Sequence, residues 1–165
     1  MDDTNDRGHA REPQVEDLAR ICQALNDVGA RYILIGGFAV ILHGGARTTK
    51  DIDLLIDSSP ANVAKVKQAL RILEDHAADE VADDDIARYT VVRVADEIVV
   101  DLMALACGID FARAWEDVEY VTVGDVSVPV ASIDTLIRTK NTPRAYDAAD
   151  RAFLNQLLRA KREHS

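Results

Sequence analysis

Apolar residues recur along the chain with two different periods, and these periods predict where helices and strands lie. Helical spacing of the apolar positions, with capping and helix-ending residues beside them, predicts helices over 13–28, 38–42, 61–75, 132–140 and 143–162. Short apolar runs between turn-forming residues predict strands over 32–35, 52–56, 86–94, 98–103, 120–123 and 126–130. The later strands are expected to pair as two hairpins that turn at Ala95-Asp96 and Gly124-Asp125.

This order of elements favours an α+β (mixed α/β) fold, in which helices cover mainly one face of a mixed sheet. The chain has 165 residues, of which 48% are hydrophobic, and this is enough for one domain with a proper core. Residues 1–12 are polar and predict a flexible tail, so the single domain is expected to span 13–165. No apolar stretch reaches the roughly 20 residues that a spanning helix needs, and the start shows no secretory signal pattern. We therefore expect a cytoplasmic protein with no membrane segment.

The net charge restricts the kinds of partner. A formal net charge of −10 argues against a broad electrostatic contact with nucleic acid. It is still compatible with a local basic groove, whose members would be Arg47, Lys50, Arg138, Lys140 and Arg144. Acidic residues gather in segment 79–85, which we interpret as a solvated loop in preference to a metal site.

A paired glycine and an Asp-x-Asp are the most informative residues of the chain. Gly36 and Gly37 close the apolar run 32–35, and without a Cβ their backbone amides can approach a polyphosphate, aided by the dipole of the helix that follows. Asp51 and Asp53 lie in a predicted strand whose side chains alternate between faces, so both carboxylates point the same way. Two such carboxylates repel each other unless a cation lies between them, and oxygen ligands suit magnesium or manganese.

The order of these residues resembles a known signature. Gly36-Gly37, the spacer, Asp51-Ile52-Asp53 and a third carboxylate on a later strand, Asp101, are similar to the signature of the nucleotidyltransferase superfamily related to DNA polymerase beta. The segment Arg47-Thr48-Thr49-Lys50 resembles the small stand-alone members. These include the minimal nucleotidyltransferases and the nucleotidyltransferase toxins of bacterial toxin–antitoxin systems. The resemblance runs from about residue 32 to residue 150.

The resemblance implies an enzyme that moves a nucleoside monophosphate from a nucleoside triphosphate, such as ATP, to a hydroxyl group and releases pyrophosphate. It implies catalytic and metal-binding roles for Asp51, Asp53 and Asp101, with Mg²⁺ or Mn²⁺ as the cofactor. The residues that it implies in nucleotide binding are Gly36, Gly37, Arg47, Lys50 and Lys140, with Thr49, Arg144 and Asp147 as further candidates. In this arrangement Asp147 orients Lys140 or Arg144.

Each role has a simpler alternative. Asp51 and Asp53 could be surface carboxylates on an edge strand, and Asp101 could be an exposed residue of an alternating strand. Arg144 and Asp147 could form only an ion pair at a solvated helix end, which contributes little free energy.

The acceptor of the nucleotide stays open at this point. The toxin branch of the resemblance implies the 3′ end of a tRNA or another RNA, and the minimal branch implies a protein side chain. The acidic chain favours a protein or a small molecule over a long nucleic acid. A cognate toxin or antitoxin is an expected partner. The alternative function is a non-catalytic nucleotide-binding or toxin–antitoxin partner protein on the same fold, which would have no need of three clustered carboxylates.

Overall fold

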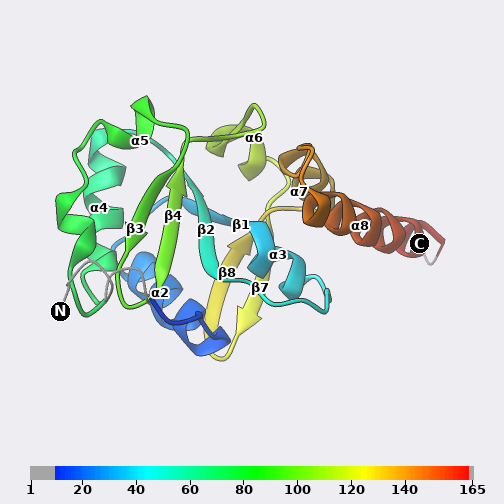
Figure 1. Ribbon diagram of the computed structural model, residues 1–165, viewed down its shortest axis with the longest axis horizontal. Helices are drawn as coiled ribbons and strands as arrows, with labels where there is room; N and C mark the ends of the chain where they lie inside the picture. The colour runs from blue at the N-terminus through cyan, green and yellow to red at the C-terminus, as the bar shows by residue number, and fades with distance from the viewer. Residues whose placement is uncertain (1–9, 164–165) are drawn as a thin grey trace.

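A six-stranded mixed sheet forms the centre of the protein, with its strands in the order β3-β4-β2-β1-β8-β7 (Figure 1). The structure is a computed structural model that describes residues 10–163. The strands are β1 (Tyr32–Ile35), β2 (Asp51–Ile56), β3 (Val92–Ala95), β4 (Val99–Met103), β7 (Glu119–Val123) and β8 (Val126–Val130), with a small separate ribbon of β5 (Leu105–Ala106) and β6 (Ile109–Asp110). β2 is parallel to β4 and β1 to β8, whereas the other neighbouring strands are antiparallel. The predicted α+β fold with a mixed sheet is confirmed.

Helices precede, connect and follow the strands of the sheet. They are α2 (Val15–Asp27), α3 (Gly36–Leu42), α4 (Pro60–Leu70), the 3₁₀ helix η1 (Ala77–Glu80), α5 (Asp85–Arg88), α6 (Phe111–Trp115), α7 (Ile133–Thr139) and α8 (Ala145–Glu163). α2 and α4 pack against each other beside the sheet (Figure 1). The hydroxyl of Tyr32 on β1 donates to the Asn26 side chain of α2 at 2.8 Å, so the face of the sheet that carries Tyr32 is turned toward α2.

Side chains alternate along β2, so apolar and acidic residues lie on opposite faces of the sheet. Ile52 and Leu54 are fully buried, and they share a face with Ile56, which pairs in register with Tyr32 and so faces α2. Asp51 and Asp53 point to the opposite face. β2 lies between β4 and β1 inside the sheet, so this opposite face is held rigidly by backbone hydrogen bonds on both sides.

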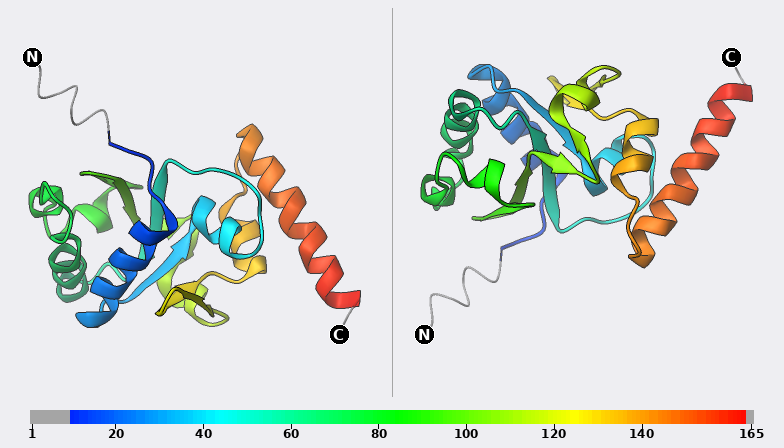
Figure 2. Two further views of the ribbon diagram at one scale, coloured as in Figure 1. Left: turned by 90° about the horizontal axis from the view of Figure 1, so that it is seen from below. Right: turned by 90° about the horizontal axis from the view of Figure 1, so that it is seen from above.

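The two ends of the described chain differ in their contacts with the rest of the protein. The predicted flexible tail of residues 1–12 lies, for residues 1–9, outside the described residues; Arg11 contacts Asp17 at 2.7 Å and Glu97 at 3.2 Å. At the other end α8 projects away from the sheet in Figure 1 and runs along one side of the protein in Figure 2, and it packs mainly against α7. Among residues 10–163, no helix combines the length and the apolar character that crossing a membrane requires.

Several predicted elements have different bounds. The strand expected over 86–94 is wrong in its first part: residues 85–88 form α5 and the strand begins at Val92. The acidic side chain of Asp85 accepts a hydrogen bond from the Ala82 backbone at 2.8 Å, which closes a turn there instead of extending the chain. The helix expected over 61–75 ends at Leu70, and the one expected at 38 begins at Gly36. The predicted cap at Ser132 is confirmed, since its hydroxyl accepts from the Thr135 backbone.

Candidate active site

Three carboxylates converge on the open face of the sheet. Asp53 on β2 and Asp101 on β4 are partners in the parallel register, and Asp51 lies two residues earlier on the same face. One oxygen from each of the three lies within 4.8 Å of the others. β2 is an interior strand and the Asp101 side chain is only 7% exposed. The alternatives that placed Asp51 and Asp53 on an edge strand and Asp101 on the surface are therefore wrong.

Burial and neighbouring charges change the ionisation of Asp51 and Asp53. Burial, with the charges of Asp51 and Asp101 nearby, raises the pKa of Asp53 to about 7. Burial and the charge of Asp101 also raise the pKa of Asp51, although Arg93 opposes the shift. Carboxylates with raised pKa values are unstable in their ionised form without a compensating cation, and a set of only oxygen ligands fits Mg²⁺ or Mn²⁺.

Arg93 is a member of the site that the sequence analysis missed. It lies opposite Asp101 in the β3–β4 pair, and its guanidinium donates to both oxygens of Asp101, at 2.9 and 3.0 Å. A third contact of 3.3 Å reaches Asp51. The predicted hairpin, with its turn at Ala95-Asp96, would place residue 93 opposite residue 98, whereas the observed pairing places Arg93 opposite Asp101. This error in the predicted register hid the contact of Arg93 with Asp101.

The glycine pair lets α3 begin directly against β2. Gly36 has φ +74°, and a Cβ there would lie 2.0 Å from Oδ2 of Asp53. A Cβ at Gly37 would lie 2.7 Å from Oγ1 of Thr49, which in turn donates to the backbone carbonyl of Asp51 at 3.1 Å. Only glycine fits the first position, because both the backbone conformation and the space exclude a side chain. The Gly-Gly therefore packs against the Asp-x-Asp segment itself.

A second charged cluster lies across the pocket, at the α7–α8 junction. Lys140 is 7% exposed, and its ammonium lies 2.9 Å from Asp150 and 3.6 Å from Asp147. Arg144 pairs with Asp147 at 2.8 Å, and Arg47 pairs with Asp150. The expected contacts of Asp147 with Lys140 and Arg144 are confirmed. Asp150 was missed, although its spacing of three residues from Asp147 in a predicted helix put both on one face.

Asp147 is held as an ionised acceptor. Burial would raise the pKa of Asp147, but hydrogen bonds from Thr142, at 2.5 Å, and from Arg144 outweigh burial, so the pKa lies below its usual value. Asp147 and Asp150 thus both hold Lys140, and Asp150 also holds Arg47, which is far away in the sequence. Arg47 also lies over the Tyr146 ring, 5.6 Å from its centroid, and Arg144 lies 4.9 Å from the same ring.

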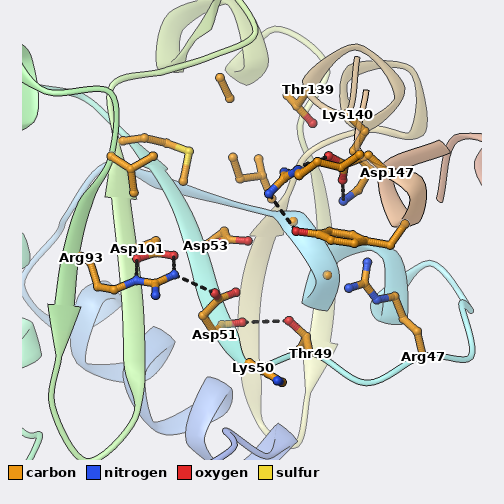
Figure 3. A pocket seen from close by; sticks show the side chains of 18 of the residues that line it. Arg47, Thr49, Lys50, Asp51, Asp53, Arg93, Asp101, Thr139, Lys140 and Asp147 are labelled. Atoms are coloured by element: carbon orange, nitrogen blue, oxygen red, sulfur yellow. Dashed lines mark hydrogen bonds and ion pairs between the residues drawn. The ribbon is translucent and has the colours of Figure 1, made fainter. Parts of the chain in front are cut away.

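The two clusters face each other in one pocket with a volume of about 860 Å³ (Figure 3). Figure 3 shows Asp51, Asp53 and Asp101 with Arg93 on one side, and Lys140, Asp147 and Arg47 on the other. The predicted residues that line the pocket are Gly36, Gly37, Arg47, Thr49, Lys50, Asp51, Asp53, Asp101, Lys140, Arg144 and Asp147. Arg138, which we expected in the basic groove, instead lines a separate small pocket with Cys107.

This fold, with a glycine pair packed on an Asp-x-Asp and a third carboxylate on the neighbouring strand, is that of a nucleotidyltransferase. The comparison with protein families agrees: residues 18–142 match the family described as nucleotidyl transferase AbiEii toxin, Type IV TA system. Because the match covers more than half of the chain, the protein belongs to this family of nucleotidyltransferases from toxin–antitoxin systems. The nucleotidyltransferase resemblance and the enzyme class predicted from the sequence are confirmed.

Solved structures of low sequence identity share the fold. A proposed nucleotidyltransferase from Thermotoga maritima has a TM-score of 0.54 and 16% identity, over 92% of this chain and 93% of that one. The lincosamide antibiotic adenylyltransferase LnuA, in its lincomycin-bound form, has a TM-score of 0.60 and 17% identity, over 89% of this chain and 99% of that one. The comparison with curated proteins finds no match.

Proposed function

We propose that the pocket transfers a nucleoside monophosphate from a nucleoside triphosphate to a hydroxyl group and releases pyrophosphate. The observation that carries this proposal is the convergence of three carboxylates from two interior strands, opposite a cluster of cations in the same pocket. A divalent cation and a polyphosphate are the two ligands whose charges such a pocket complements.

Asp51, Asp53 and Asp101 would hold the Mg²⁺ or Mn²⁺. The raised pKa values of Asp51 and Asp53 support this assignment, because a bound cation would offset the burial and the repulsion that raise them. When bound, the metal supplies neutralisation of the phosphate oxygens and lowers the pKa of the acceptor hydroxyl.

The opposite wall would hold the triphosphate. Lys140 is pre-ordered by Asp150 and Asp147, and Arg47 is ordered by Asp150, so these cations lose little conformational entropy when they bind phosphate. Lys50 and Arg144 line the same pocket and add positive charge. Gly36 and Gly37 leave the strand-to-helix turn free of side chains, which lets the triphosphate lie close to the backbone.

In the transfer step, the oxygen of the acceptor hydroxyl forms a bond to the α-phosphorus. The bond from that phosphorus to the bridging oxygen breaks, and pyrophosphate leaves with the electron pair. Asp101 lies on β4 directly beside Asp53 of β2, and we assign its carboxylate as the acceptor of the hydroxyl proton. Lys140 and Arg47 stabilise the charge on the leaving pyrophosphate.

The acceptor hydroxyl belongs to an RNA 3′ end or to a protein side chain. The net charge of −10 supports the protein acceptor, because it disfavours the extended electrostatic contact that a polyanion such as RNA makes. The family supports a toxin role with a cognate antitoxin as partner. Val91, Met103 and Ala106 line an apolar part of the pocket, which supports an uncharged body next to the acceptor hydroxyl.

The test is label transfer from α-labelled nucleoside triphosphates, with Mg²⁺ or Mn²⁺, into separate RNA, protein and small-molecule fractions of the host cell. The Asp51→Ala/Asp53→Ala variant and the Asp57→Ala variant run beside the wild type, since Asp57 lies outside the pocket at the far end of β2. We expect one labelled fraction in wild type and Asp57→Ala, and none in the double variant. Label that persists in the double variant would refute the proposed site.

A further inference from the structure

Arg93 holds the acidic side of the pocket in its observed arrangement (Figure 3). Its Nε donates to Oδ1 of Asp101 at 2.9 Å, and a terminal nitrogen donates to Oδ2 at 3.0 Å. The same terminal nitrogen lies 3.3 Å from Oδ2 of Asp51. Because a planar guanidinium matches a carboxylate in this two-bonded geometry, Asp101 is fixed in one orientation by a cation.

The carboxylates that Arg93 contacts are those that would bind the metal. An oxygen of Asp51 and an oxygen of Asp101 belong to the group that lies within 4.8 Å, together with Asp53. A divalent cation bound among these oxygens would lie next to the guanidinium. Like charges at such a distance repel strongly, and more so beside buried carboxylates than in bulk water. Tight binding of the metal and the present position of Arg93 are therefore in competition.

Arg93 is also placed so that it can leave. Its strand, β3, is at the edge of the sheet, and its side chain is 59% exposed, whereas the Asp101 side chain is 7% exposed. Rotation about the long side chain moves the guanidinium into water without any movement of β4. The carboxylate that stays behind is held by an interior strand.

We propose that Arg93 is an internal counter-ion that neutralises Asp101 and Asp51 in the metal-free protein and is displaced from Asp101 when the divalent cation binds. It is a positioning residue, because it orients Asp101 toward the site before the metal arrives, and it weakens metal binding by competing for the same carboxylates. The inference rests on the metal role given to these aspartates under the proposed function.

The test is calorimetric titration of the metal-free protein with Mn²⁺, which needs no turnover. The variants are Arg93→Ala and Arg93→Gln, and the matched control is Arg88→Ala. Arg88 is an exposed arginine of α5 that pairs with Asp84 and does not line the pocket. We expect both Arg93 variants to bind Mn²⁺ about tenfold more tightly than wild type, and Arg88→Ala to bind it as wild type does. Thermal unfolding supplies a second measurement: Arg93→Ala lowers Tm in EDTA but not in saturating Mn²⁺.

The outcomes separate this inference from the function on which it rests. If wild type binds Mn²⁺ and the Arg93 variants bind it equally or more weakly, the counter-ion role is overturned while the metal site stands. If neither wild type nor the Arg93 variants bind Mn²⁺, the metal site fails and the counter-ion role fails with it. If neither Arg93 variant folds even in saturating Mn²⁺, Arg93 is a fixed structural residue and the displacement is refuted.

Discussion

Replacing Asp53 with asparagine tests whether the acidic cluster costs the protein stability in the absence of metal. Burial and the neighbouring carboxylates raise the pKa of Asp53 from 3.8 to about 7. The folded state therefore binds a proton at Asp53 more tightly than the unfolded chain does. For this group the free energy of unfolding falls as the pH rises between about 4 and about 7, and the loss is complete above that range.

The size of the effect follows from the shift. One pKa unit corresponds to about 1.4 kcal/mol, so ionised Asp53 destabilises the metal-free protein by up to about 4 kcal/mol above neutral pH. Asparagine has nearly the same shape and no charge, but its amide must find partners in the same place, which reduces the gain. We expect Asp53→Asn to raise the free energy of unfolding by about 1–4 kcal/mol near pH 8 in EDTA, and by much less near pH 5.

The assay is urea unfolding in EDTA at both pH values, and Asp57→Asn is the matched control. Asp57 follows the same strand, but the Ser59 backbone N–H and Arg31 lower its pKa, so its ionised form stabilises the folded state. Asp57→Asn should destabilise the protein above about pH 4, the opposite sign. Equal stabilities of Asp53→Asn and wild type near pH 8, or parallel pH profiles, would refute this account of the cluster.

Three further substitutions test other parts of the site. Gly36→Ala should destabilise the protein well beyond the roughly 1 kcal/mol of strain expected in Gly29→Ala, because both glycines have positive φ but only Gly36 lies against Asp53. Urea unfolding compares the two variants, and equal losses of stability would contradict the contact. Lys140→Met should cost about 3–5 kcal/mol of stability in the same assay, because it removes the buried ammonium that lies beside the carboxylates of Asp150 and Asp147. An unchanged stability would mean that these buried ion pairs do not stabilise the fold. Lys50→Ala should weaken nucleotide binding several-fold in a fluorescent-nucleotide titration, whereas Lys65→Ala should not, because Lys65 is exposed and lies outside the pocket. Equal affinities of the two variants for the nucleotide would show that Lys50 is not part of the site.

The sequence was sufficient for the parts of the site that follow from local pattern. Alternation along 52–56 placed Asp51 and Asp53 on one face, and the apolar residues around Asp101 placed it on a strand. These inferences hold because the pleat of a strand and the burial of an interior strand depend on few neighbours. The three-residue spacing of Arg144 and Asp147 in the last predicted helix likewise indicated their ion pair, whereas the place of Lys140 beside Asp147 was implied by the family resemblance.

Other parts depend on pairing between distant segments and could not be read locally. The order of the strands put β2 next to both β1 and β4, and that order decides that Asp53 and Asp101 meet. The ion pair of Arg47 with Asp150 joins residues 103 positions apart, and the contact of Arg93 with Asp51 joins residues 42 apart. The switch from helix to strand near Tyr89 was missed because the apolar residues on either side of it suit both structures.

The most direct test of the central claim is a crystal structure of the protein with Mn²⁺ and a non-hydrolysable nucleoside triphosphate, measured at a wavelength at which manganese scatters anomalously. The account predicts anomalous density among Asp51, Asp53 and Asp101, the triphosphate against Lys140 and Arg47, and the α-phosphorus on the side of Asp101. Manganese bound instead at the acidic segment 79–85, or a nucleotide bound outside this pocket, would contradict it.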